Sequence, residues 1–201
     1  MWAIGLTGGI GSGKSSVANW LKEHGIPVLD ADQTVHQLLA EDQTTIRRVA
    51  QAFGEDILDT QGKINRRALG IKVFNNDEAR KRLEEILHPL ARGKMFSEQI
   101  ALAASGVKLC FWDVPLLFEA GFSTSMNEVW VVWVPLQIQL ERVMKRDSFT
   151  CSEAELRISA QWPLDDKKEM AEVVIDNSGT WEYTVSQLEA LLVRIKNRIS
   201  L

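Results

Sequence analysis

The sequence is poor in cysteine and has no long apolar run. Its two cysteines, Cys110 and Cys151, form no CxxC pair, which excludes a disulfide-rich scaffold and a cysteine-based zinc site. Cys110 falls in an apolar run, where we expect a buried thiol that packs like a small hydrophobic side chain. No apolar stretch approaches the ~20 residues that cross a bilayer, and no leading segment is typical of a secretory signal. We therefore expect a cytoplasmic protein without a membrane partner.

The sequence also lacks a surplus of positive charge. Its 23 Lys and Arg residues are outnumbered by 27 Asp and Glu residues, which gives a net charge of −4. A protein that follows a nucleic-acid backbone needs a basic surface, so we expect no nucleic-acid partner. Any bound polyanion must be small and held in a local basic pocket. The length of 201 residues suits one well-buried domain with room for a smaller inserted lobe.

Apolar runs and helical periodicity alternate at the start of the chain. Residues 2–7 and 26–29 are short apolar runs, and residues 15–24 carry apolar side chains at helical spacing. Gly25 suits the left-handed position that ends a helix. A strand, a helix and a strand within about thirty residues predict a βαβ unit and a parallel sheet.

The stretch from residue 33 to residue 105 has a different pattern. Its apolar residues recur at intervals of three and four without a clear strand, which predicts a helical insertion. Further strands are predicted at 107–114, 128–134 and 173–175, and helices at 136–146, 152–161 and 181–199. The sequence therefore predicts an α/β protein in which residues 1–32 and 106–201 form a core with a five-stranded parallel sheet.

Residues 8–15 read Gly-Gly-Ile-Gly-Ser-Gly-Lys-Ser, between a predicted strand and a predicted helix. In this pattern the glycines let successive N–H groups point at phosphate oxygens, and the helix N-terminus adds positive potential. The lysine reaches the β- and γ-phosphates, and the following hydroxyl ligates Mg²⁺. The alternative is a glycine-rich turn that carries a lysine by chance. The pattern predicts an ATP site formed by Gly11, Ser12, Gly13, Lys14, Ser15 and Ser16.

The rest of the chain narrows the class of P-loop protein. A switch GTPase should carry an Asn-Lys-x-Asp guanine reader, which the sequence lacks. Motor and ABC-type ATPases usually have longer chains. A small-molecule kinase fits best, because the helical insertion can bind the acceptor.

Six ordered blocks carry a more specific resemblance. They are residues 6–15, 30–32, 87–89, 113–119, 157–161 and 174–179. In order and spacing the chain resembles the dephospho-CoA kinase family over nearly its whole length. The resemblance implies transfer of the ATP γ-phosphoryl group to the ribose 3′-hydroxyl of dephospho-CoA, with Mg²⁺. It also implies a three-layer α/β/α core, a CoA-binding lobe at 33–105 and a lid at about 142–170. The alternatives are a kinase of nucleoside monophosphates or other small metabolites, and a non-catalytic nucleotide-dependent switch.

Two aspartates follow predicted strands, at the sheet edge where open α/β folds bind ligands. We expect Asp32 to orient and deprotonate the acceptor hydroxyl; the alternative is that Asp30 or Asp32 caps the next helix. We expect Asp113 to support Mg²⁺ together with Ser15; the alternative is an N-cap for the turn at Pro115. Pro115 and Glu119 belong to the same edge and are candidates for acceptor binding.

The predicted lid carries cations one helical turn apart. Arg142 and Arg146 share a helix face, where like charges repel unless they face phosphate. With Arg157, Gln161 and Lys167 they predict a lid that closes on ATP, with Arg142 catalytic alongside Lys14 and Asp32. The alternative for each is a solvated charged helix face.

Three further positions complete the predicted sites. Asn177 belongs to a loop expected to pack under the adenine, and His88, before Pro89, is a substrate-side candidate through the family resemblance. His36 is assigned to an exposed helix face, and Arg80 is an unranked candidate for the anionic acceptor. We expect a monomer or a small homo-oligomer.

Overall fold

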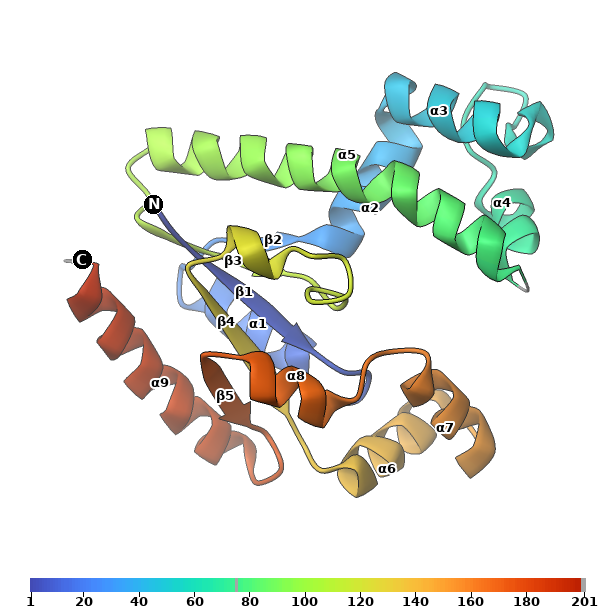
Figure 1. Cartoon of the computed structure of the whole chain (residues 1–201). Helices are drawn as coiled ribbons and strands as arrows, with labels where there is room; N and C mark the ends of the chain where they lie inside the picture. Colours follow the sequence, from blue (N-terminus) through green and yellow to red (C-terminus); the bar gives the residue numbers. More distant parts are fainter. Residues whose placement is uncertain (75, 200–201) are drawn as a thin grey trace. The chain divides into compact units, whose positions relative to one another are not determined.

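The computed structural model describes residues 1–74 and 76–199 (Figure 1). The chain divides into two compact units, residues 1–29 with 102–201 and residues 30–101; the first unit's last two residues lie outside the described part. The predicted limits of the insertion, 33 and 105, lie three and four residues from these boundaries. The assignment of that stretch to CoA binding stays a prediction.

The first unit contains the sheet. Its strands are β1 (Trp2–Gly8), β2 (Val28–Asp30), β3 (Leu109–Asp113), β4 (Glu128–Trp133) and β5 (Val173–Asp176). Its helices are α1 (Lys14–Glu23), α6 (Leu136–Asp147), α7 (Cys151–Ser159), α8 (Leu164–Met170) and α9 (Trp181–Arg198), with a short 3₁₀ turn, η2 (Ser123–Ser125).

The strand order is β2-β3-β1-β4-β5. β1 pairs in parallel with both β3 and β4, and β4 with β5. In this register Leu6 lies opposite Asp113, so the end of β3 and the loop after β1 meet at one sheet edge. The predicted α/β class and five-stranded parallel sheet are confirmed.

The core of this unit lies between the sheet and two helices. Apolar residues of β1, β3, β4 and β5 pack against Val17 and Leu21 of α1 and Leu188 and Ile195 of α9. These helix positions recur at three- and four-residue spacing, so each helix presents one apolar stripe to the sheet. α1 ends with Gly25 at φ 73°, whose N–H bonds the Lys22 carbonyl. This is the helix stop predicted from the sequence.

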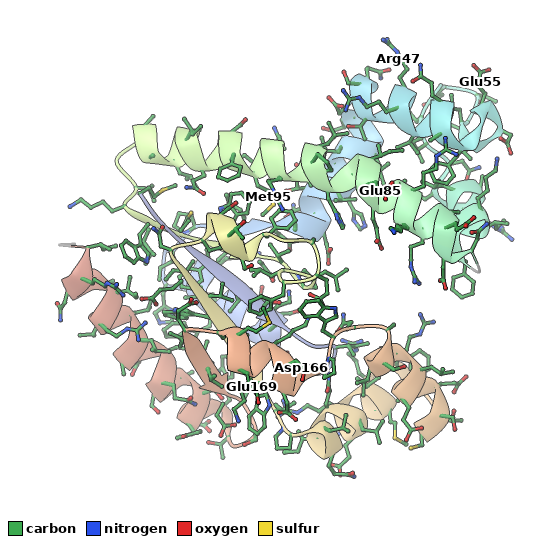
Figure 2. All side chains as sticks on the ribbon, viewed as in Figure 1. Arg47, Glu55, Glu85, Met95, Asp166 and Glu169 are labelled. Atoms are coloured by element: carbon green, nitrogen blue, oxygen red, sulfur yellow. The ribbon has the colours of Figure 1, made fainter. Side chains whose placement is uncertain are left out.

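The second unit is helical. It contains α2 (Ala31–Glu41), α3 (Gln43–Phe53), the 3₁₀ turn η1 (Glu55–Ile57), α4 (Arg66–Phe74) and most of α5 (Asp77–Ala104). Val49, Ile57, Leu69 and Leu87 belong to one buried apolar cluster that joins these elements. Charged side chains such as Arg47 and Glu55 extend from its surface (Figure 2).

Two features of the helices differ from the sequence prediction. A proline inside a helix usually kinks or ends it, and from the sequence we expect His88 and Pro89 to interrupt the helical pattern, but α5 continues through both residues. Helix α8 was not predicted at all, because its seven residues include five charged ones and carry little apolar signal. None of the helices in residues 1–74 and 76–199 is long and apolar enough to cross a membrane.

Candidate active site

The loop between β1 and α1 forms a compact cradle. Its turn is closed by a hydrogen bond from the Ser12 N–H to the Gly9 carbonyl, 3.1 Å. Gly13, at φ 92°, precedes α1, and no side chain caps this helix. A β-carbon at Gly13 would be strained at this φ and would collide with the side-chain nitrogen of Asn177. The first N–H groups of α1 are therefore not occupied by a capping side chain, as anion binding requires.

Polar side chains line this cradle. Within the described part of the chain, the Ser12 hydroxyl oxygen is buried without a hydrogen-bond partner, and a buried hydroxyl in that condition is costly unless a ligand completes it. Ser15 and Ser16 are exposed in the first turn of α1. The predicted ATP-binding residues 11–16 thus lie in one loop and one helical turn.

Lys14 and Asp113 form an ion pair at the edge of the sheet. Their side chains are 13% and 7% exposed, so the pair is shielded from solvent. Asp113 ends β3, and parallel pairing with β1 brings it to the phosphate loop. Residues 115–121, which follow Asp113, form turns.

Asn177 contacts the cradle through its side chain. Its Nδ2 donates to the Ser12 carbonyl at 2.7 Å, and its Oδ1 accepts from the Thr184 hydroxyl at 2.8 Å. Arg142 donates to the Asn177 carbonyl at 2.9 Å. The fold therefore brings Arg142 and Asn177 to the phosphate loop, but the Asn177 amide is occupied by protein and shapes the loop.

Arg146 pairs with the carboxylate of its neighbour Asp147. Its guanidinium makes two hydrogen bonds to Asp147, at 2.9 and 2.8 Å, on the exposed end of α6. This contact holds the pKa of Asp147 below its usual value and raises that of Arg146. Arg157 lies 5.8 Å from the Phe149 ring centroid. A role for either arginine in binding ATP stays a prediction.

Lys167 is not a lid cation, contrary to the sequence prediction. It is fully buried and pairs with Glu119 at 2.7 Å, and its ammonium also donates to the Pro115 carbonyl at 3.0 Å. The Thr7 hydroxyl donates to the same carbonyl at 3.0 Å. Asp166 and Glu169 are among the residues of α8 that reach the surface (Figure 2). Lys167 is directed inward because it lies three residues after Leu164, so the two side chains share one helix face, and that face is buried.

Glu119 and Pro115 are held by this contact. Glu119 Oε1 also accepts from the Trp162 N–H at 3.3 Å. Glu119 Oε2 is buried without a partner among residues 1–74 and 76–199. The carboxylate is thus partly committed to the protein, and a direct role in acceptor binding stays a prediction.

In the helical unit, Asp30 and Asp32 differ sharply in their surroundings. Asp30 caps α2, with Oδ1 accepting from the Gln33 N–H at 2.9 Å. Asp32 lies exposed in the first turn and lines a cavity of about 340 Å³ between α2 and α5. Asp30 is therefore the residue that caps the helix. Asp32 lines a space that a ligand can enter.

The same cavity gathers residues that the sequence did not connect. Besides Asp32 it is lined by His36, Arg80, Glu84 and His88. His88 was named from the family resemblance alone, and His36 was assigned to an exposed face. Residues 36, 80, 84 and 88 are four or more apart along two helices, and only the packing of α2 on α5 brings them together. The spacing 80-84-88 on one helix face was the available signal.

The predicted metal ligands are Ser15 and Asp113. Across the described residues there is no cluster of three or more His, Cys, Asp or Glu side chains that could hold a metal ion. Mg²⁺ in phosphoryl-transfer sites takes one or two protein ligands, with the remainder from substrate phosphates and water. The Ser15 hydroxyl and the Asp113 carboxylate are the predicted ligands of this kind, and their binding of Mg²⁺ stays a prediction.

Comparison with known proteins gives a consistent result. The family model described as dephospho-CoA kinase matches residues 2–182. A dephospho-CoA kinase of Geobacillus kaustophilus is 49% identical over 94% of this chain and 94% of its own. Among solved structures, a protein of Thermus thermophilus is 34% identical with a TM-score of 0.78, covering 96% of this chain and 97% of its own. A dephospho-CoA kinase of Campylobacter jejuni is 29% identical with a TM-score of 0.71, covering 94% and 96%.

Proposed function

Since the chain belongs to the dephospho-CoA kinase family, we propose that it transfers the γ-phosphoryl group of ATP to the ribose 3′-hydroxyl of dephospho-CoA, giving CoA and ADP. The observation that carries the proposal is the phosphate cradle at residues 8–15 within a chain that matches the family over residues 2–182. The net charge of −4 agrees with small-molecule substrates and no nucleic acid. We propose the cytoplasm as the compartment and a monomer or small homo-oligomer as the active form.

The donor half of the reaction rests on the first unit. The N–H groups of residues 11–16 and the N-terminus of α1 bind the phosphates, while Lys14 neutralises their charge. Lys14 leaves Asp113 for the phosphates when ATP binds, because a triphosphate offers more negative charge than one carboxylate. Arg142, held by the Asn177 carbonyl, adds positive charge to the transferring group. Arg146 exchanges its contact with Asp147 for phosphate.

Magnesium would be held by Ser15 and Asp113. An ion held there would supply positive charge that stabilises the donor phosphates during transfer. The Asp113 carboxylate would become available to it once Lys14 turns to the phosphates.

The acceptor half rests on the cavity of the helical unit. Asp32 accepts the proton of the 3′-hydroxyl as the oxygen attacks phosphorus. His88 donates to oxygens of the acceptor, with Arg80 as an additional cation in the same cavity. Pro115 and Glu119 remain proposed acceptor-binding residues.

Acceptor specificity provides the decisive test. Purified protein is incubated with Mg-ATP and dephospho-CoA, AMP, CMP or no acceptor, and ADP release is measured together with the 3′-phosphate product. We expect turnover well above background with dephospho-CoA only. Turnover with a nucleoside monophosphate and none with dephospho-CoA would assign the chain to the other class of P-loop kinase.

A further inference from the structure

The tip of the phosphate loop is held by two side-chain amides. The Ile10 N–H donates to Gln161 Oε1 at 2.9 Å, and the Ile10 carbonyl accepts from Gln139 Nε2 at 2.7 Å. A carbonyl can only accept and an N–H can only donate, so the orientation of each carboxamide is fixed. Both hydrogen-bonding groups of Ile10 are therefore used by side chains far away in sequence.

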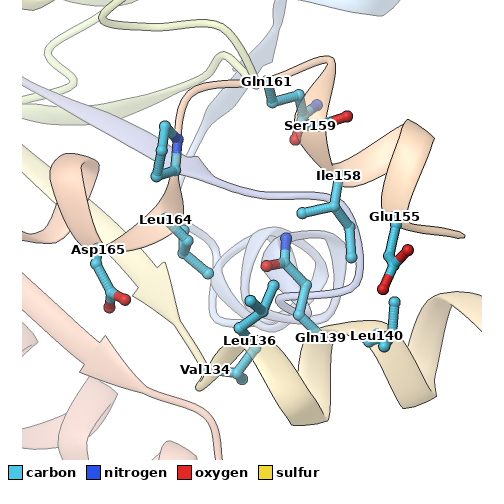
Figure 3. A pocket seen from close by; sticks show the side chains of 11 residues that line it. Val134, Leu136, Gln139, Leu140, Glu155, Ile158, Ser159, Gln161, Leu164 and Asp165 are labelled. Atoms are coloured by element: carbon cyan, nitrogen blue, oxygen red, sulfur yellow. The ribbon is translucent and has the colours of Figure 1, made fainter.

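The two glutamines come from opposite ends of one helical arm, which we define as α6, α7 and the residues up to Gln161. Gln139 lies in the second turn of α6, and Gln161 follows α7, which packs on α6. The loop that follows β1 passes between the two side chains, which line the same pocket (Figure 3). The arm thus hydrogen-bonds the loop tip on two sides.

Burial makes this contact difficult to replace. Gln139 is 3% exposed, so loss of its amide would take from the half-buried Ile10 carbonyl a hydrogen-bond partner that the fold holds in place. The approach is also close, since a β-carbon at Gly9 would lie 2.5 Å from Gln139 Nε2. The glycine at this position allows the amide to reach the backbone.

We propose that Gln139 and Gln161 are positioning residues that hold the loop tip in its phosphate-binding form and so set the affinity for ATP. This role rests on the proposed function for its substrate but concerns the donor alone. Because both amides bond the backbone of Ile10 at the loop tip, they act on ATP binding through the loop. Because the arm also carries Arg142, the contact links the arm to the loop that binds the donor phosphates.

The test compares three substitutions of glutamine by methionine, which keeps the length and removes the amide. Gln139→Met and Gln161→Met each break one contact to Ile10. Gln137→Met is the matched control, since Gln137 lies exposed on the same helix and its side-chain amide donates to Glu141 at 2.9 Å. Calorimetric titration with Mg-ATP gives Kd for each variant, and thermal unfolding gives Tm.

We expect Kd for ATP to rise about tenfold, equivalent to about 1.4 kcal/mol, in Gln139→Met and in Gln161→Met. The control should stay within twofold of the parent. At saturating ATP, KM for dephospho-CoA should be unchanged in all three. The ATP titration needs no acceptor. If dephospho-CoA is not a substrate, the proposed function is wrong, but the measured Kd values for ATP still test the role of the two glutamines.

Unchanged ATP affinity in Gln161→Met would overturn the proposal, and so would an equal loss in Gln137→Met. If Gln139→Met fails to fold, Gln161 decides the matter through amide exchange at Ile10. Exchange should quicken in Gln161→Met and return to the parent rate in Gln161→Glu, which keeps an acceptor oxygen. Slow exchange in Gln161→Met would show that the contact does not hold the loop.

Discussion

Individual polar side chains near the phosphate loop are mostly engaged by other parts of the protein. Asn177 bonds Ser12 and Thr184, Lys167 bonds Glu119, and Lys14 bonds Asp113. A buried polar group without a partner costs about 1–3 kcal/mol, so these contacts keep the loop's surroundings in one arrangement. Asp32 differs because its carboxylate is exposed and lines a cavity.

Replacement of Asp32 by Asn tests its role as the base. The amide keeps the shape but cannot take the proton, so we expect kcat to fall by about 10²–10⁴ with little change in Tm. Asp30→Asn is the matched control, because Asn is as good an N-cap as Asp and Asp30 serves that role here. A kcat for Asp32→Asn within a few-fold of the parent would remove Asp32 from the mechanism.

At the scale of secondary structure, helix ends depend on single side chains. Asp42 caps α3, and its Oδ1 accepts from both the N–H and the hydroxyl of Thr45 at 2.6 Å. The side-chain hydrogen bond from Thr45, followed by the one from its backbone, lowers the pKa of Asp42 from 3.8. Because the folded pKa is the lower one, this stabilisation is present above pH 3.8 and is lost as pH falls through the folded pKa.

Asp42→Ala should therefore destabilise the protein most at neutral pH. Loss of an N-cap costs about 1 kcal/mol, and the difference from the parent should shrink as pH falls from 5 towards 2. Urea unfolding at several pH values measures it. A difference that stays constant down to pH 2 would contradict a role for the ionised carboxylate.

The buried pair of Lys167 and Glu119 joins α8 to the loop after β3. Lys167→Met leaves the Glu119 carboxylate without its cation, and breaking one side of a buried pair costs about 3 kcal/mol. Glu119→Gln in the same chain should restore part of this loss. Lys168→Met is the control, since Lys168 lies over the Trp133 ring at 3.7 Å and should cost less than about 1 kcal/mol. Strict additivity of the two changes in urea unfolding would show that the pair is not coupled.

At the scale of the whole molecule, the chain consists of an α/β unit with the phosphate cradle and a helical unit with the Asp32 cavity. Ligands that bind only the folded state stabilise it through mass action. ATP should stabilise the first unit in this way, because that unit carries the phosphate cradle.

Mg-ATP at 100 times its Kd should raise the free energy of unfolding by about 2.7 kcal/mol. We expect Lys14→Ala to abolish this gain and the phosphoryl transfer, while the far-UV circular dichroism stays unchanged. Lys22→Ala, at an exposed position on the same helix, should keep both. Chelation of Mg²⁺ should abolish turnover, and ATP stabilisation of Lys14→Ala equal to that of the parent would exclude Lys14 from phosphate binding.

The sequence by itself determined the α/β class, the phosphate loop and the family. These features are local or periodic: the Gly-rich pattern lies in eight consecutive residues, and the β-strands and amphipathic helices repeat every two or every 3.6 residues. Blocks of residues in a fixed order identified the family without any knowledge of contacts. The sequence also predicted a lid, but it assigned Lys167 to the lid's surface, where the structure shows a buried side chain.

Only the tertiary structure decided which polar groups share a contact. Lys167 reads as a surface lysine among charged neighbours, yet it pairs with Glu119, 48 positions earlier in the chain. Gln139 and Gln161 meet at Ile10 across more than 120 residues, and the Asp32 cavity forms where α2 packs against α5. The physical reason is that a side chain's hydrogen-bond partner depends on where the backbone returns in space, and residue type and spacing along the chain do not contain that information.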